Sequence, residues 1–86
     1  MPEVSRFLGI VIGMFFNDHN PPPFHASYGE HEAAVSIREG AVLWGSLPRR
    51  ALGHVEEWRQ AHVVELEENW ERARAKRLLR PIAPLE

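Results

Sequence analysis

The first half of the chain has the hydrophobic pattern of short strands. Residues 4–7 and 10–16 are rich in β-branched and aromatic side chains and show no helical period, so we predict two strands separated by Leu8 and Gly9. In the second segment, even-numbered positions such as Ile12 and Met14 share one face, and Val11, Gly13 and Phe15 share the other. Because both faces are apolar, this segment is predicted to be a central strand.

Three further strands complete the predicted sheet. Residues 24–28 alternate, with Phe24 and Ala26 on one face and His25 on the other, so His25 is expected to project away from the core. A connection at residues 29–32 leads to a return strand at 33–38, and a turn at Glu39 and Gly40 leads to a last strand at 41–44. We therefore predict an antiparallel meander of four or five strands within residues 1–47.

The second half is predicted to be one long or bent helix that covers this sheet. No proline occurs between Pro48 and Pro81, and the helix is expected to span residues 48–77. One apolar stripe follows the helical period and contains Ala51, Leu52, Val55, Trp58, His62, Leu66, Trp70 and Ala73, although Arg59 and Asn69 also fall within it. A straight helix of about 27 residues would be about 40 Å long, so we expect a bend near residues 61–63 or a projecting end that meets a partner.

The predicted fold class is therefore α+β, in a single domain that ends in an extended tail at residues 78–86. Ile82 and Leu85 of this tail are expected to pack on the surface. A domain of 86 residues buries only a modest share of its surface, so a protein partner or a homodimer would add stability.

Composition narrows the function classes. The net charge of −2 argues against a domain that coats nucleic acid non-specifically, and the absence of cysteine excludes disulfides and thiolate metal sites. The apolar run at residues 7–16 is too short to span a membrane. We expect a cytoplasmic protein without membrane attachment. Five of its ten basic residues lie between Arg72 and Arg80, where they suit the end of a helix or a small patch for phosphate.

A polar segment at residues 17–25 is the strongest candidate for a functional site. It contains Asn17, Asp18, His19, Asn20, three consecutive prolines, Phe24 and His25. Three prolines fix the backbone and remove three N–H donors, so the segment is expected to be a rigid surface loop that is neither helix nor central strand.

Three interpretations of this loop remain open. In the first, His19 and His25 act as general acid and base on a phosphodiester while Asp18 orients one ring, which requires no cofactor. In the second, the histidines and Asp18 bind Zn, Ni or Mn, although their spacing is not diagnostic. In the third, the polar side chains only satisfy the backbone of a turn. His31 and Glu30 are further candidates to support the site.

Binding residues are predicted at two other places. Arg49 and Arg50 lie at a predicted helix amino terminus, where the helix dipole disfavours cations, so they are candidates to meet a phosphate or another anion. Solvated surface arginines are the alternative. Trp58 and Trp70 are expected to pack in the core or, alternatively, to contact a protein partner. We also predict that Trp70, Asn17 and Asn20 are binding residues.

The sequence resembles a bacterial family known as domain of unknown function 4160. The resemblance is carried by Ser5 to Phe7, Gly9 to Ile12, Asn17 to Pro22, Phe24 to Ala26, Glu68 to Trp70, Ile82, Pro84 and Leu85. The family usually has a third histidine in the loop, at the position that Pro23 occupies here. This substitution removes one candidate metal ligand and leaves the pair of His19 and His25.

The resemblance implies a small bacterial protein that is often encoded beside another small domain of unknown function. Such pairs are commonly proposed to be toxin–antitoxin modules. From the resemblance and the loop together, we expect the toxin component of a two-gene module, acting on RNA through the histidine pair. The alternative is a non-enzymatic accessory module that binds a protein, with or without a metal. The expected partner is the small protein encoded by the neighbouring gene.

Overall fold

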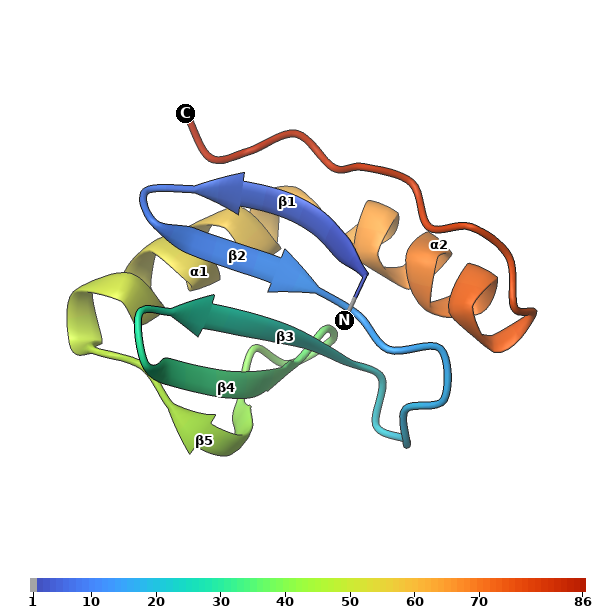
Figure 1. The fold of residues 1–86 in the computed structure, drawn as a ribbon, viewed down its shortest axis with the longest axis horizontal. Coiled ribbons are helices and arrows are strands. Elements are labelled where there is room, and N and C mark those ends of the chain that lie inside the picture. Colours follow the sequence, from blue (N-terminus) through green and yellow to red (C-terminus); the bar gives the residue numbers. More distant parts are fainter. Residues whose placement is uncertain (1) are drawn as a thin grey trace.

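The computed structural model describes residues 2–86 and contains one antiparallel sheet with two helices on one of its faces (Figure 1). The strands are β1 (Glu3–Phe7), β2 (Ile10–Gly13), β3 (Pro23–Tyr28), β4 (His31–Ser36) and β5 (Val42–Ser46). They follow one another across the sheet in chain order, each antiparallel to the next. The predicted α+β meander is thus confirmed, with five strands and β2 in a central position.

The predicted long helix is divided into α1 (Arg49–Ala61) and α2 (Val63–Arg74). The break is at His62, whose φ of −132° and ψ of 24° are not helical, so the bend expected near residues 61–63 is confirmed. The helical part is shorter than expected because α2 ends at Arg74 and Lys76 has a positive φ of 57°. No helix within residues 2–86 is long and apolar enough to cross a bilayer.

The main core lies between the sheet and the helices. Trp58 of α1 is fully buried, and its ring centroid is 5.5 Å from that of Phe7 and 5.9 Å from that of Phe24. Leu66 and Trp70 of α2 belong to the same core. The apolar helix stripe predicted from the sequence therefore faces the sheet.

Two polar residues of that stripe are buried with specific partners. Arg59 donates hydrogen bonds to the Glu56 carboxylate at 2.6 and 2.8 Å and to the Ile37 carbonyl at 2.8 Å. Asn69 both accepts from the Arg80 N–H and donates to the Arg80 carbonyl, at 2.8 and 2.9 Å. Both residues therefore tie the helices to other segments, and they do not interrupt the core.

The carboxyl-terminal tail runs along the outer side of β1 (Figure 1). The Ile82 N–H donates to the Val4 carbonyl at 2.8 Å, and Trp58 Nε1 donates to the Ala83 carbonyl at 2.8 Å. Ile82 is buried and Leu85 is partly buried against the core, as the sequence predicted. The tail thus covers the β1 edge of the sheet, whereas all five residues of β5 at the other edge are exposed.

Several sequence predictions about the first half of the chain need correction. The return strand spans residues 31–36 and not 33–38. The second strand ends at Gly13 and not at Phe16, because the chain leaves the sheet there and folds over one of its faces. The last strand spans residues 42–46 and not 41–44. The proline segment is less exposed than predicted: Pro22 is buried, and Pro23 is the first residue of the central strand β3, a position where proline is tolerated.

Candidate functional site

The site is built around His25, on the face of the sheet opposite the helices. His25 is paired in register with Gly13 of β2 and with Ala34 of β4. Because neither neighbour has a large side chain, the imidazole has room to lie on this face of the sheet. His25 therefore projects away from the main core, as its position in the alternating strand predicted.

Two aromatic rings cover His25, which the sequence did not predict. Phe15 lies edge-on to the imidazole, with a centroid distance of 4.6 Å and an interplanar angle of 90°, and Trp44 of β5 lies 5.5 Å away. As a result only 3% of His25 is exposed. The two covering residues remain exposed themselves, Phe15 by 40% and Trp44 by 52%.

A hydrogen bond between Asp18 and His25 connects the proline-containing loop to strand β3. Nε2 of His25 donates a hydrogen bond to Oδ2 of Asp18 at 2.7 Å, and Oδ1 of Asp18 accepts the backbone N–H of His19 at 2.9 Å. On the other side of the ring, Nδ1 of His25 is 3.7 Å from a carboxylate oxygen of Glu32. Nδ1 is buried and has no hydrogen-bond partner. The imidazole is thus enclosed between two carboxylates.

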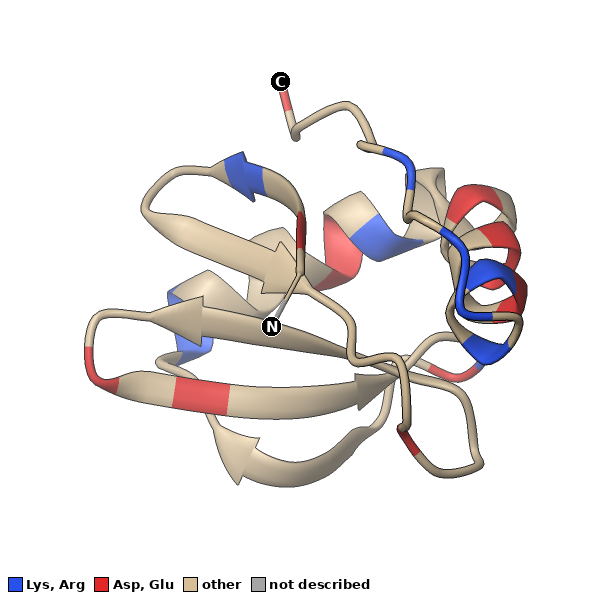
Figure 2. Ribbon diagram, turned by 45° about the vertical axis from the view of Figure 1, so that its right-hand side comes forward, with Lys and Arg blue, Asp and Glu red and all other residues tan. Residues whose placement is uncertain are grey.

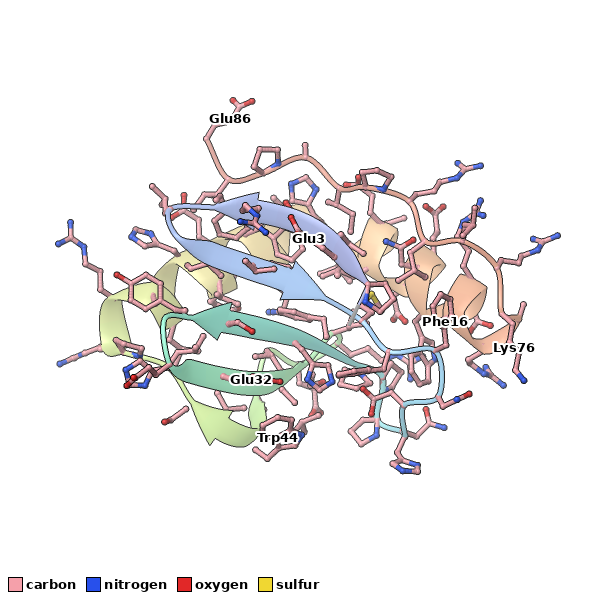
Figure 3. The ribbon with its side chains drawn as sticks, in the orientation of Figure 1. Glu3, Phe16, Glu32, Trp44, Lys76 and Glu86 are labelled. Atoms are coloured by element: carbon pink, nitrogen blue, oxygen red, sulfur yellow. The ribbon has the colours of Figure 1, made fainter. Side chains whose placement is uncertain are left out.

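A shallow hollow opens beside this cluster. Its walls include the aromatic rings of Phe15, Phe16 and Trp44, together with Asp18 and His19, and it also reaches Pro2, Asn17 and His25. Figure 3 shows Phe16 beside the loop and Trp44 on β5, both far from the tail end at Glu86. The hollow therefore combines an apolar rim with one carboxylate.

No lysine or arginine of the described residues 2–86 contributes to this hollow. Figure 2 shows lysine and arginine on α1, on α2, on the tail and at a few other places, while strands β2 to β5 contain neither. The chain has no lysine or arginine between Arg6 and Arg38, whereas Asp18, Glu30 and Glu32 lie in that interval. The described lining of the hollow therefore has one carboxylate, that of Asp18, and no lysine or arginine.

In a scan against protein families, residues 9–71 match the family described as Domain of unknown function (DUF4160). The chain belongs to this family. The matched region extends from the turn before β2 to within α2, and so contains the loop, His25 and Trp44. Searches of curated proteins and of solved structures found no match.

The structure brings together only part of the predicted site. Asp18, His19, His25 and Asn17 share the hollow. Asn20 is exposed and precedes a cis bond to Pro21. His31 is the first residue of β4 and pairs with Tyr28. It precedes Ala34, the residue that pairs with His25, by three positions, so it lies about 10 Å from Ala34 along the strand. Glu30 lies in the turn just before it, at the same end of the sheet.

The predicted binding residues outside the loop lie elsewhere. Arg49 and Arg50 are exposed in the first turn of α1 and contribute to two other hollows, with Glu39 and with Tyr28 respectively. Trp70 is 4% exposed and packs in the main core, where it has no surface to offer a ligand. These three residues therefore form no site with His25.

Sequence reasoning missed Phe15, Trp44 and Glu32 as parts of the site. The signal for Phe15 was present, because strand alternation placed it with Gly13 on the face away from Met14. Trp44 gave no such signal, since a single tryptophan in a short strand suits either face. A bulge in the pairing of β4 with β5 between Ala34 and Val35, which the sequence does not reveal, also affects its placement.

The arrangement limits the chemistry of His25. Neither ring nitrogen faces the hollow freely, because one is bound to Asp18 and the other is buried. Among the residues that the structure describes, no three His, Cys, Asp or Glu side chains are grouped so that they could hold a metal ion. His25 in this position acts as the anchor of the loop, while His19, Asp18 and the aromatic rings are the groups that a ligand can reach.

Proposed function

We propose that this chain is a non-enzymatic protein-binding module, which docks a small protein partner at the hollow beside His25. The observation that carries the proposal is the exposure of Phe15, Phe16 and Trp44, by 40%, 37% and 52%, around one hollow. Aromatic side chains are enriched at the centres of protein interfaces because they bury a large area at a low cost in entropy.

The fixed positions of these rings favour binding. Phe15 and Trp44 pack against a buried imidazole that is itself held by Asp18, so less conformational entropy is lost when a partner covers them. The enclosure of His25 also favours a binding role over a catalytic one, since a general base must reach the proton that it removes.

The proposed partner is the small protein encoded by the neighbouring gene, as the family resemblance implies. The described lining of the hollow contains no lysine or arginine, which favours a protein over RNA because phosphate groups would find no permanent cation among these residues.

Co-expression tests this proposal. The chain is produced together with the neighbouring gene product, and the complex is measured by size-exclusion chromatography with light scattering. We expect a stoichiometric complex that is lost in the double variant Phe15→Ala/Trp44→Ala. The matched control is Tyr28→Ala, which removes an aromatic residue of similar exposure, 39%, from the far end of β3. A complex that survives the double variant would refute docking at the hollow.

A second candidate function is RNA cleavage by the toxin component of a two-gene module. It is favoured by one observation, that His19 and the bonded pair of His25 and Asp18 line the same hollow. This candidate predicts growth arrest when the chain is expressed alone in a bacterial host, and relief of the arrest by His19→Ala. The control is His31→Ala, which removes an exposed histidine outside the hollow. Arrest that persists in His19→Ala at equal soluble protein would exclude this histidine chemistry.

A further inference from the structure

The hollow has the composition of a site for an organic cation. Three of its walls are the aromatic rings of Phe15, Phe16 and Trp44. The face of an aromatic ring carries partial negative charge, which attracts ammonium and guanidinium groups within about 6 Å of the ring centre. An aliphatic hollow of the same size would lack this attraction.

The charges around the hollow favour the same ligand. Asp18 lies in its wall with 20% of its side chain exposed, and Glu32 approaches His25 from the other side with 46% exposed. Among the described residues that line the hollow, His19 is the exposed group that can become cationic, while His25 is enclosed between the two carboxylates. Since no lysine or arginine lies between Arg6 and Arg38, none in that segment competes for these carboxylates.

We propose that the hollow takes a lysine or arginine side chain of the protein partner, and that this side chain is the anchor of the docked complex. The inference rests on the proposed function and specifies which chemistry of the partner is recognised. The cation lies against the rings of Phe15 and Trp44 and forms an ion pair with Asp18, whose two oxygens retain free lone pairs beside their present hydrogen bonds. The neighbouring residues of the partner lie over Phe16.

Short blocked peptides test the chemistry without the partner. The first probe is acetyl-Ala-Ala-Arg-Ala-Ala-amide, and the second carries citrulline in place of arginine, which preserves shape and removes the charge. Binding is followed by the NMR shift of the Trp44 indole N–H, which can be told apart from those of Trp58 and Trp70 because both of these are buried. We expect the arginine peptide to bind about 5-fold or more tightly than the citrulline peptide, from the ring contacts and the ion pair together.

Variants locate the effect. Phe15→Leu keeps an apolar side chain but removes the ring, and we expect it to reduce the preference for arginine over citrulline. Tyr28→Leu, at the far end of β3, is expected to leave this preference unchanged. Equal binding of the two peptides, or binding of neither, would overturn the cation proposal, and so would a preference that Phe15→Leu does not alter.

These outcomes are distinct from failure of the proposed function. If the complex with the neighbouring gene product depends on Phe15 and Trp44 while the two peptides bind equally, docking stands and the cation proposal fails. If the complex does not depend on these two residues, docking at the hollow itself fails, whatever the peptides show.

Discussion

The two faces of the sheet differ in how completely the chain covers them. On the helix side, Trp58 and Phe24 are fully buried and in contact with each other. On the loop side, His25 is buried to a similar degree, but the rings that cover it, Phe15 and Trp44, remain about half exposed. The helix side of the sheet is covered by contacts within the chain, whereas the loop side presents apolar surface that the chain does not cover. We infer that the helix side supplies most of the stability and that the loop side is the surface for recognition.

The largest expected effect is on the helix side. Trp58→Ala removes a fully buried side chain, its contacts with Phe7 and Phe24 and its hydrogen bond to the tail. We expect the free energy of unfolding to fall by about 3–5 kcal/mol, as for other large-to-small changes in a core. Urea denaturation of the natural protein and of Trp58→Ala measures this loss. A loss no greater than that of Trp44→Ala would contradict the difference between the faces.

The next effect concerns the backbone beneath Trp44. Gly45 has a φ of +78°, and a Cβ there would lie 2.2 Å from the Glu32 carbonyl oxygen. Gly45→Ala should therefore cost about 2–4 kcal/mol, from the left-handed backbone and the steric clash together. The control is Gly53→Ala in α1, where a Cβ would meet nothing within 4 Å. Gly53→Ala should raise stability slightly, by about 0.5–1 kcal/mol. Equal unfolding midpoints of the two variants would be evidence against this account.

A pH-dependent effect is expected on the helix side. The hydrogen bonds from Arg59 hold the pKa of the Glu56 carboxyl below its ordinary value of 4.5. Because the folded-state pKa is lowered, the ion pair contributes fully above that ordinary value, and the contribution is lost as the pH falls through the folded-state pKa. Near neutral pH, Glu56→Gln should cost about 1–2 kcal/mol, less than a fully buried pair because Glu56 is 37% exposed.

The natural protein and Glu56→Gln are compared by thermal unfolding over a range of pH. Their difference should shrink on acidification, since a protonated Glu56 resembles glutamine. A difference that is independent of pH would show that the ion pair does not contribute. Glu71→Gln is the control, because its exposed pair with Arg74 has a distance of 3.4 Å and should contribute little.

The smallest expected effect on stability is on the loop side. Trp44→Ala removes a side chain that is 52% exposed, so the free energy of unfolding should fall by about 1 kcal/mol or less. Urea denaturation of Trp44→Ala and Trp58→Ala in parallel compares the losses in unfolding free energy directly. A loss of several kcal/mol would mean that Trp44 is a core residue and would remove the reason to regard it as free for a partner.

Much of the fold could be predicted from the sequence because the hydrophobic periods were clear. Alternation in residues 24–28 assigned Phe24 to the core and His25 to the opposite face, and the helix stripe assigned Trp58 and Leu66 to the sheet. The bend at His62 could be anticipated from length alone. The strand ends could not, since the apolar run continues to Phe16 although the backbone leaves the sheet after Gly13.

The candidate site was only partly predictable. The composition of the loop pointed to Asp18, His19 and His25, and the structure brings these three together. Local patterns gave no means of predicting that Trp44, nineteen positions after His25, would enclose the imidazole. The pairing of β3, β4 and β5 determines this long-range contact, which leaves His25, a predicted general acid or base, buried and bound to Asp18.

The most direct test of the account is the affinity of the Trp44→Ala variant for the neighbouring gene product, measured by isothermal titration calorimetry with the natural protein and Tyr28→Ala in parallel. If the loop side is the recognition surface, Trp44→Ala remains folded and binds about 30-fold or more weakly, as expected for a central interface residue. Tyr28→Ala should bind like the natural protein. Unchanged affinity of a folded Trp44→Ala variant would contradict the central claim.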